Sequence, residues 1–499
     1  MKQVNKIIVA ALAMVSAVSC NLEYYPDTAI NTEDAMESAA DCKAFRTGLY
    51  SGMKGLFTGG YVYAPELQTD LYHAVRNFGN FSGNWYTYNV TAAEGEASSA
   101  WFGIYSAIAN ANFLISGTQK LLAAGTLDEA DTKTVQQYYG EACYLRAHMY
   151  YLLTMYFCKD YEPDTAENEL GVPVVTVYEP TFDSSKYPAR GTLAATYAQI
   201  TADLDEAAKY VTAPGVVCSP YVTVDVVKAL TAKVALTMHD YDKAIKNAKD
   251  LIDAGTYELE TSADAYKSSW TNDDLKETIW QAAMTGQDDR GNSMSYFIYN
   301  TSGKDGADNP QYIPEKWVLD LYDKSNDIRY AAYFDERSIT SPVTGTLTLL
   351  VKYPGNPKLY SSVTNYCNMP KIFRISEMYL ILAEAAAKKG GQDAVASLYL
   401  NQLKSKRIQG WQTVNYTGVN LMAEIRNERV RELFGEGDRM FDLKRWHIGF
   451  TRDEGQNPSL IQPGYNYKKD ADDPEFLWPI PTDEIQANSK IEQNEAYRR

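Results

Sequence analysis

The stretch from Ala423 to Trp446 constrains the fold more than any other part of the chain, because acids and bases alternate there with large apolar residues. On a helix, Glu428 lies one turn from both Arg431 and Glu432, and the flanking leucines, phenylalanines and tryptophan need burial. Gly435 and Gly437 interrupt the period, which predicts two helical pieces with a tight junction. The stretch forms either a solvated helix with surface salt bridges or a semi-buried ion-pair network that fixes how two helices meet. Neither is catalytic, because carboxylates paired with arginine are poor general acids.

The first 20 residues read as a secretory segment. Lys2 and Lys6 precede an apolar run from Ile7 to Val18 that is too short to span a bilayer. Small residues followed by Cys20 are typical of a lipoprotein processing site, so we expect a signal peptide at 1–19 and a lipidated tether at 20–34. The alternative is an ordinary signal peptide that is cleaved nearby, with Cys20 incidental.

The net charge of −17 narrows the class of ligand. Phosphate backbones would be repelled, which argues against nucleic acid, and no basic patch for anionic lipid is evident. The charge suits a body that faces water and binds neutral or cationic ligands. The four histidines, His73, His148, His239 and His447, are isolated from one another and form no metal motif. The sequence therefore shows no metal-binding motif, leaves open whether a metal ion is bound, and gives no reason to expect a cofactor.

Helical periodicity recurs in pairs of segments. A helix–turn–helix of about 34 residues with small residues at the crossing occurs within 192–255, and a second occurs within 371–407. Residues 99–158 form a looser pair, and 423–450 can contribute part of a fourth. Such pairs bury a continuous core only when they stack. We predict a mostly α fold: a right-handed scaffold of about four tetratricopeptide-like helix pairs, with irregular loop-rich excursions and a few short β-strands.

The two excursions, at about 57–100 and 270–369, lack a sustained period and are rich in glycine, asparagine and aromatic residues. Tyrosine is abundant in the chain, with 39 residues against 15 Phe and 8 Trp. Tyrosine and tryptophan faces offer apolar area at low entropy cost together with a polar tip. Sugar rings match such faces, so these excursions are candidates for a ligand-binding surface.

The C-terminal stretch resembles the signature of the SusD/RagB family of bacterial surface lipoproteins. The matching positions are Glu428-Arg429, Glu432-Leu433, Glu436-Gly437, Arg439, Asp442-Leu443 and Arg445-Trp446. A second resemblance lies at Glu141, Leu145, Arg146 and Ala147. The matches extend over the mature chain, so 35–499 is expected to be a single SusD-like domain.

The resemblance implies a specific function, which the composition alone does not indicate. It implies non-catalytic capture of an oligo- or polysaccharide and its delivery to a partner, a SusC-like TonB-dependent transporter. It also implies anchoring to the outer membrane through lipid alone, facing the cell exterior.

Within the family, the binding face is generally built from the two excursions. The stacking candidates are Trp85, Tyr86 and Trp101, although Trp101 begins a helical stripe and core packing suits it equally. The remaining candidates are hydrogen-bonding residues in the first excursion and tyrosines in the second: Asp70, Arg76, Asn80, Asn84, Tyr296 and Tyr299.

Two alternatives remain open. A glycoside hydrolase would need two carboxylates facing each other across a cleft, one of them with a raised pKa. A helical-repeat scaffold would instead bind a peptide or protein in its groove. No motif supports the hydrolase, and the aromatic excursions argue against the scaffold.

Overall fold

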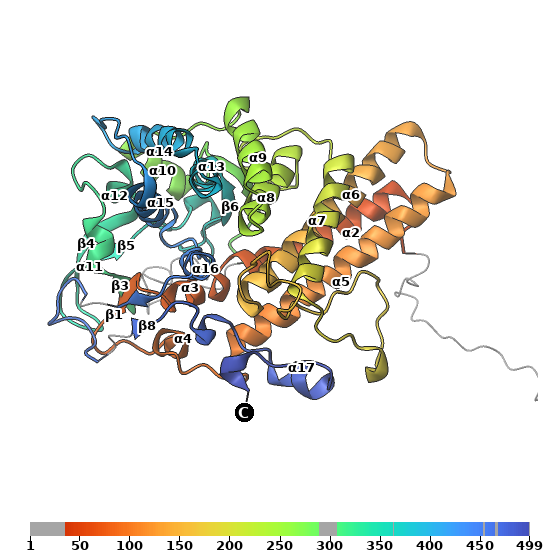
Figure 1. Cartoon of the computed structure of the whole chain (residues 1–499), viewed down its shortest axis with the longest axis horizontal. Coiled ribbons are helices and arrows are strands. Elements are labelled where there is room, and N and C mark those ends of the chain that lie inside the picture. The colour runs from red at the N-terminus through yellow and green to blue at the C-terminus, as the bar shows by residue number, and fades with distance from the viewer. Residues whose placement is uncertain (1–34, 289–306, 363, 453–454, 465–467, 499) are drawn as a thin grey trace, which may run out of the picture.

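The computed structural model describes residues 35–288, 307–362, 364–452, 455–464 and 468–498. The fold is mostly α with short strands, which confirms the predicted class. Long helices lie at one side of the molecule, shorter helix pairs at the other, and the C-terminal segment runs beneath both (Figure 1). No helix in these ranges is long and apolar enough to cross a membrane.

The longest elements are α5 (Gly95–Ala124) and α6 (Glu129–Phe157), which form an antiparallel hairpin. Gly125 ends α5 in the left-handed conformation, and the Asp128 carboxylate caps α6 by accepting a hydrogen bond from the backbone N–H of Asp131. Helix α2 (Ala39–Met53) packs on both, and α7 (Leu193–Tyr210) packs on α6. Every residue of α6 from 139 to 151 is buried, as expected for a helix with neighbours on all sides.

The second signature motif joins these helices. Glu141 on α6 accepts a hydrogen bond from Arg46 on α2 at 2.6 Å. Arg146 donates to Asp203 on α7, also at 2.6 Å. Both pairs are largely buried, so the motif serves the packing of α6 and not a surface function.

The helix pairs predicted at 192–255 and 371–407 are present. They are α8 (Val224–Thr237) with α9 (Tyr241–Ala254), and α13 (Ile375–Lys389) with α14 (Asp393–Arg407). The small residues Ala229, Ala232 and Ala235 are buried, so these helices can approach closely. Helix α13 contacts α9, α14 and α15 (Gly418–Leu433), so the pairs form one stack.

The first excursion, expected to be irregular, is a packed unit. It contains α3 (Gly60–Leu67), β1 (Tyr72–Ala74) and α4 (Gly83–Thr87). Strand β1 pairs antiparallel with β3 (Tyr312–Pro314) of the second excursion, which joins the two excursions. Several of their aromatic residues, among them Tyr72, Tyr86 and Tyr312, fill a second core. Short elements of this kind escape periodicity analysis because each is only one or two turns or a few residues long.

The other strands also form antiparallel pairs: β2 (Thr278–Gln281) with β6 (Lys371–Arg374), β4 (Phe334–Ile339) with β5 (Gly345–Leu350), and β7 (Phe450–Thr451) with β8 (Lys468–Lys469). The remaining helices are α10 (Ala263–Asn272), α11 (Lys316–Asp320), α12 (Ile328–Tyr333), α16 (Arg439–Arg445) and α17 (Thr482–Ala487).

The C-terminal motif forms a buried ion-pair network. Glu432 on α15 accepts hydrogen bonds from Arg374 at 2.7 Å and from Arg407 at 2.8 Å. Glu428 accepts from Arg329 and Arg431, each at 2.7 Å. These contacts connect α15 to α12, β6 and α14. The prediction of an ion-pair network is confirmed, and its carboxylates are fully buried.

The two helical pieces and their junction are also present. Gly435 and Gly437, with φ of 77° and 90°, turn the chain between α15 and α16. On α16, Arg445 donates to Asp442 at 2.8 Å and to Glu384 of α13 at 2.7 Å. The guanidinium of Arg445 counteracts burial and holds the pKa of Glu384 below its ordinary value. Arg429 of α15 donates to Asp442 of α16 at 2.7 Å, so the network joins the two helices across their junction.

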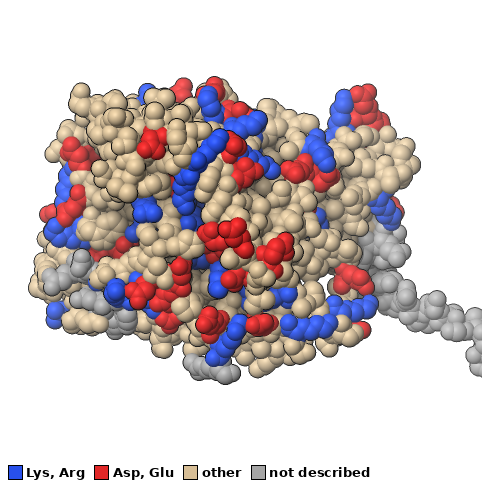
Figure 2. Space-filling view, in the orientation of Figure 1, with Lys and Arg blue, Asp and Glu red and all other residues tan. Residues whose placement is uncertain are grey.

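One face of the protein carries charged side chains of both signs (Figure 2). Figure 2 shows acidic and basic side chains scattered over the face it presents, separated by areas of other residues. Basic side chains form a narrow run near the centre of this face, and acidic side chains gather below it.

Candidate ligand-binding surface

The three predicted stacking residues lie in the interior. Trp85 is 0% exposed and its ring packs against Trp478, with centroids 4.2 Å apart. Tyr86 is also 0% exposed, and its hydroxyl accepts a hydrogen bond from the Ala74 N–H at 3.1 Å. Trp101 is 1% exposed. Their burial contradicts the predicted stacking on a sugar, because no ring face of the three reaches the surface. For Trp101 the structure favours core packing, which the helical stripe had left open.

Two of the predicted polar residues are engaged by other groups of the protein. Asp70 is 8% exposed and accepts hydrogen bonds from Arg439 of the C-terminal motif at 2.9 and 3.0 Å. Asn84 is half-buried and donates to Glu94 at 3.0 Å. Asp70 thus joins the first excursion to α16, and its predicted contact with a ligand is contradicted by this burial and pairing.

Arg76 and Asn80 do reach the surface, on the loop formed by residues 76–82 between β1 and α4. Phe81 on the same loop is 40% exposed. Asn77, Asn80 and Ser82 have positive φ, which keeps the loop tightly curled. Of the seven predicted residues that the structure describes, two therefore lie together at the surface, with one aromatic residue that the sequence analysis did not select.

Loop 76–82 is held through its backbone. The Arg76 N–H donates to the Leu460 carbonyl at 2.8 Å, and the Phe81 carbonyl accepts from the Tyr312 hydroxyl at 2.7 Å. The Gly79 N–H also donates to the side chain of Gln311. These contacts leave the Arg76 and Asn80 residues exposed on a loop that is shaped before any ligand arrives.

The second excursion borders this loop. Tyr312 and Gln311, which contact loop 76–82, lie at the point where the described chain resumes after residue 306. The predicted contacts Tyr296 and Tyr299 lie outside the described residues. So does the predicted lipidation site Cys20.

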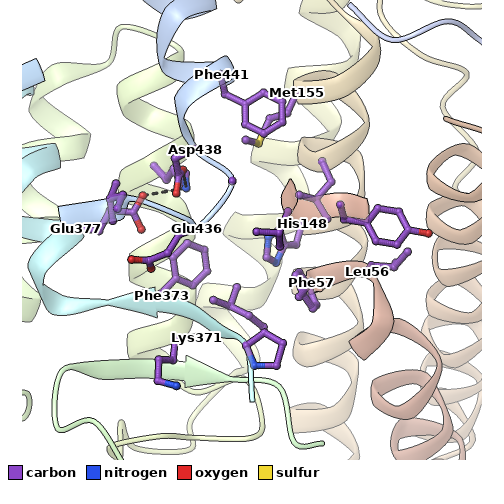
Figure 3. Close-up of a pocket in the computed structure, with 18 of the residues that line it drawn as sticks. Leu56, Phe57, His148, Met155, Lys371, Phe373, Glu377, Glu436, Asp438 and Phe441 are labelled. Carbon is purple, nitrogen blue, oxygen red and sulfur yellow. Dashed lines mark hydrogen bonds and ion pairs between the residues drawn. The ribbon is translucent and has the colours of Figure 1, made fainter. Parts of the chain in front are cut away.

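A cavity of about 110 Å³ lies between α6, α8, β6 and the α15–α16 junction. Figure 3 shows His148 between Phe57 and Phe373, with Glu377 and Asp438 on the opposite wall. Lys233 joins these two acids, at 2.9 Å from Glu377 and 2.8 Å from Asp438. Burial lowers the pKa of His148 to about 3, so the ring is neutral at physiological pH.

This cavity is too small for a glycan. Pockets that enclose drug-sized ligands measure about 300–1,000 Å³, whereas a space of about 110 Å³ suits a few water molecules. Its charged residues come from separate elements, and the sequence contained no signal that would have placed them together.

A larger cavity of about 570 Å³ opens between the loop after α6 and the C-terminal segment. Its lining has both signs of charge, including Asp160, Glu162, Arg190, Lys444 and His447. The sequence analysis selected none of these residues for function, since they lie up to 287 positions apart and show no motif.

Family comparisons place the chain among known proteins. The SusD family model matches residues 299–497, and a second family model, described as starch-binding and associating with the outer membrane, matches residues 22–236. A curated relative, SusD-like protein P38 of Formosa agariphila, is 21% identical over 98% of both chains.

Solved structures share the fold. A SusD superfamily protein from Bacteroides thetaiotaomicron has a TM-score of 0.78 at 27% identity, covering 92% of this chain and 99% of its own. A SusD-like carbohydrate binding protein from Bacteroides vulgatus has a TM-score of 0.72 at 20% identity, covering 91% of this chain and 97% of its own. Each match spans nearly the whole of both chains.

Proposed function

This chain belongs to the SusD family, and on that premise we propose that it binds an oligo- or polysaccharide at the bacterial cell surface without cleaving it. The bound glycan then passes to a SusC-like TonB-dependent transporter in the outer membrane. The family description "starch-binding" and the carbohydrate-binding name of the Bacteroides vulgatus neighbour support this class of ligand.

The observation that carries the proposal is loop 76–82. Arg76 offers several N–H donors and Asn80 offers both a donor and an acceptor, which suits the hydroxyl groups of a sugar. Phe81 adds partly exposed aromatic area beside them. The backbone anchors of the loop make the site preformed, so binding costs little ordering entropy.

We place the binding face at this loop and its border with the second excursion. Tyr296 and Tyr299 remain proposed contacts from that excursion. Trp85, Tyr86, Trp101 and Asp70 are not part of the proposed face, because they serve the core.

The proposed attachment is a lipid on Cys20 after removal of residues 1–19, with 20–34 as the tether. A Cys20→Ser variant is expected to leave the membrane fraction, and its retention there would argue against the lipid anchor. Digestion of intact cells with an added protease tests the outward orientation.

Affinity electrophoresis through gels that contain single polysaccharides tests the binding. We expect one polymer to retard the purified protein, and Arg76→Ala or Asn80→Ala to reduce that retardation at least several-fold. Lys133→Ala provides the control, because Lys133 is exposed on α6 and pairs only with Glu129 among the described residues. Equal retardation of all variants would remove loop 76–82 from the site.

The same gels separate the alternatives. Release of reducing sugar from the retarding polymer would establish a hydrolase. Failure to bind any glycan of a broad panel would favour a peptide or protein ligand. Burial raises the carboxyl pKa values of Glu66 and Glu377, but both side chains lie in the interior, away from a surface ligand. Burial also raises the pKa of Glu94, which is half-buried and accepts a hydrogen bond from Asn84, so release of reducing sugar is the result that separates binding from hydrolysis.

A further inference from the structure

Four segments distant in sequence meet beside the larger cavity: the loop after α6, the α8–α9 turn, the short stretch just after α16 and the C-terminal loop before Pro474. They bring together Asp160, Glu162, His239, His447 and Asp472. Asp160, Glu162 and His239 each offer one possible ligand atom, and these three atoms lie within 4.8 Å of one another. Imidazole nitrogens combined with carboxylate oxygens are ligands that zinc and similar ions prefer.

Two imidazoles face the same carboxylate oxygen. Glu162 Oε1 lies 3.8 Å from His239 Nε2 and 2.7 Å from His447 Nε2. Two donors on one tetrahedral zinc ion, with bonds of about 2.0–2.1 Å, are about 3.3 Å apart. The observed distances lie on both sides of this value, so small side-chain movements would give the geometry of a metal site.

Asp160 supplies an independent observation. Its Oδ2 atom is buried and has no hydrogen-bond partner among the described residues. A buried carboxylate oxygen without a partner is costly, and such a group in a native protein calls for an explanation such as a bound ion. Burial also raises the pKa of Asp160 to about 6, although Lys444 and Arg445 act in the opposite direction.

Although burial opposes it, hydrogen bonds to carboxylates at both ring nitrogens raise the pKa of His447, and a metal ion at Nε2 would replace a proton there. Its Nδ1 atom is 2.6 Å from Asp472 Oδ1, which directs Nε2 toward Glu162. A carboxylate behind a histidine is the usual support of metal-bound imidazole. The nearby Lys444 ammonium is occupied by the carbonyl groups of Met155 and Cys158, at 2.6 and 2.7 Å.

We propose that Asp160, Glu162 and His239 bind one divalent transition-metal ion of the zinc class, with His447 as the fourth donor. The ion would connect the helix stack, through the α8–α9 turn, to the C-terminal segment. This site is separate from loop 76–82 and does not depend on glycan binding.

Calorimetric titration of chelator-treated, untagged protein with Zn²⁺ tests the site, and Co²⁺ reports ligand geometry through its visible absorption. We expect one ion per chain, a tetrahedral Co²⁺ spectrum, and a melting temperature that rises with Zn²⁺ concentration. Asp160→Asn and His239→Asn are expected to weaken binding at least 30-fold. Asparagine suits position 239 because the residue has φ of 62°, a conformation that asparagine tolerates.

Asp250→Asn on the exposed side of α9 is the matched control, and it should bind Zn²⁺ as the wild type does. The melting temperatures of all variants without metal show whether they are folded. Absence of saturable binding by the folded wild type would overturn the proposal. Equal affinity of the wild type, Asp160→Asn and His239→Asn would also overturn it, because the ion would then bind elsewhere.

Discussion

Replacing Glu428 by glutamine removes one charge from the buried network and leaves the shape of the side chain almost unchanged. Glu428 is 0% exposed and accepts hydrogen bonds from Arg329 and Arg431 at 2.7 Å. Burial opposes the charge of Glu428, but the two guanidinium groups outweigh it and lower the pKa from 4.5 to about 2. The variant leaves these cations without this carboxylate, which is the costly way to break a buried ion pair.

The expected loss of stability follows from this pKa. Since one pKa unit corresponds to about 1.4 kcal/mol, the charged Glu428 contributes about 3 kcal/mol to the free energy of unfolding at pH 7. Loss of one partner from a buried pair costs a similar amount, about 3–5 kcal/mol. Because the folded pKa is the lower one, this contribution is full above pH 4.5 and declines as the pH falls toward 2. At pH 3.5 it is about 2 kcal/mol.

Urea unfolding, followed by tryptophan fluorescence at pH 7 and pH 3.5, measures the difference in free energy of unfolding between the wild type and Glu428→Gln. We expect that difference to shrink by about 1 kcal/mol at the lower pH. Glu129→Gln is the control, because the Glu129–Lys133 pair is exposed, and its stability should match the wild type. A Glu428→Gln protein as stable as the wild type, or a difference that does not change with pH, would refute the reasoning.

Three further predictions concern packing and the cavity of Figure 3. Trp85→Ala should lower the free energy of unfolding in urea by about 3–5 kcal/mol without altering glycan retardation of the folded protein. If the variant instead loses retardation and keeps its stability, Trp85 contacts the glycan. Gly435→Ala should destabilise more than Gly125→Ala, because both have positive φ but only at Gly435 does a Cβ meet an atom, Leu350 Cδ2 at 2.9 Å. Equal melting temperatures for the two variants would contradict this. Finally, the folded pKa of His148 lies below its unfolded value of 6.5, so the wild type loses stability as pH falls below 6.5. Between pH 7.5 and 5 the free energy of unfolding of the wild type should fall by about 2 kcal/mol more than that of His148→Phe. If the two proteins lose the same stability over this range, His148 does not titrate in this way.

The helix pairs could be predicted because the signals for them are local. Caps such as Asp128, the glycine after α9 and the apolar period of each helix lie within one element, so neighbouring residues contain the information. The C-terminal motif was similarly informative. Its alternation of charges and apolar residues limited the stretch to two alternatives, a solvated helix with surface salt bridges or a semi-buried ion-pair network, and burial decided for the network.

The partners in that network could not be predicted. Arg329, Arg374 and Arg407 reach Glu432 from three other elements, and nothing in the sequence near them identifies this acid as their common acceptor. The same holds for the proposed metal site, where Glu162 and His239 approach each other only because α7 and α8 return the chain to the end of α6.

The sequence by itself determined a mostly helical scaffold of helix pairs and the family resemblance. Only the tertiary structure decided which aromatic residues are buried. Trp85 and Phe81 lie four positions apart in the same irregular stretch, yet one is 0% and the other 40% exposed. An irregular segment has no fixed period to assign a side chain to the core or to water, so its exposure depends on what packs against it. Here Trp478 covers Trp85 from almost 400 residues further along the chain.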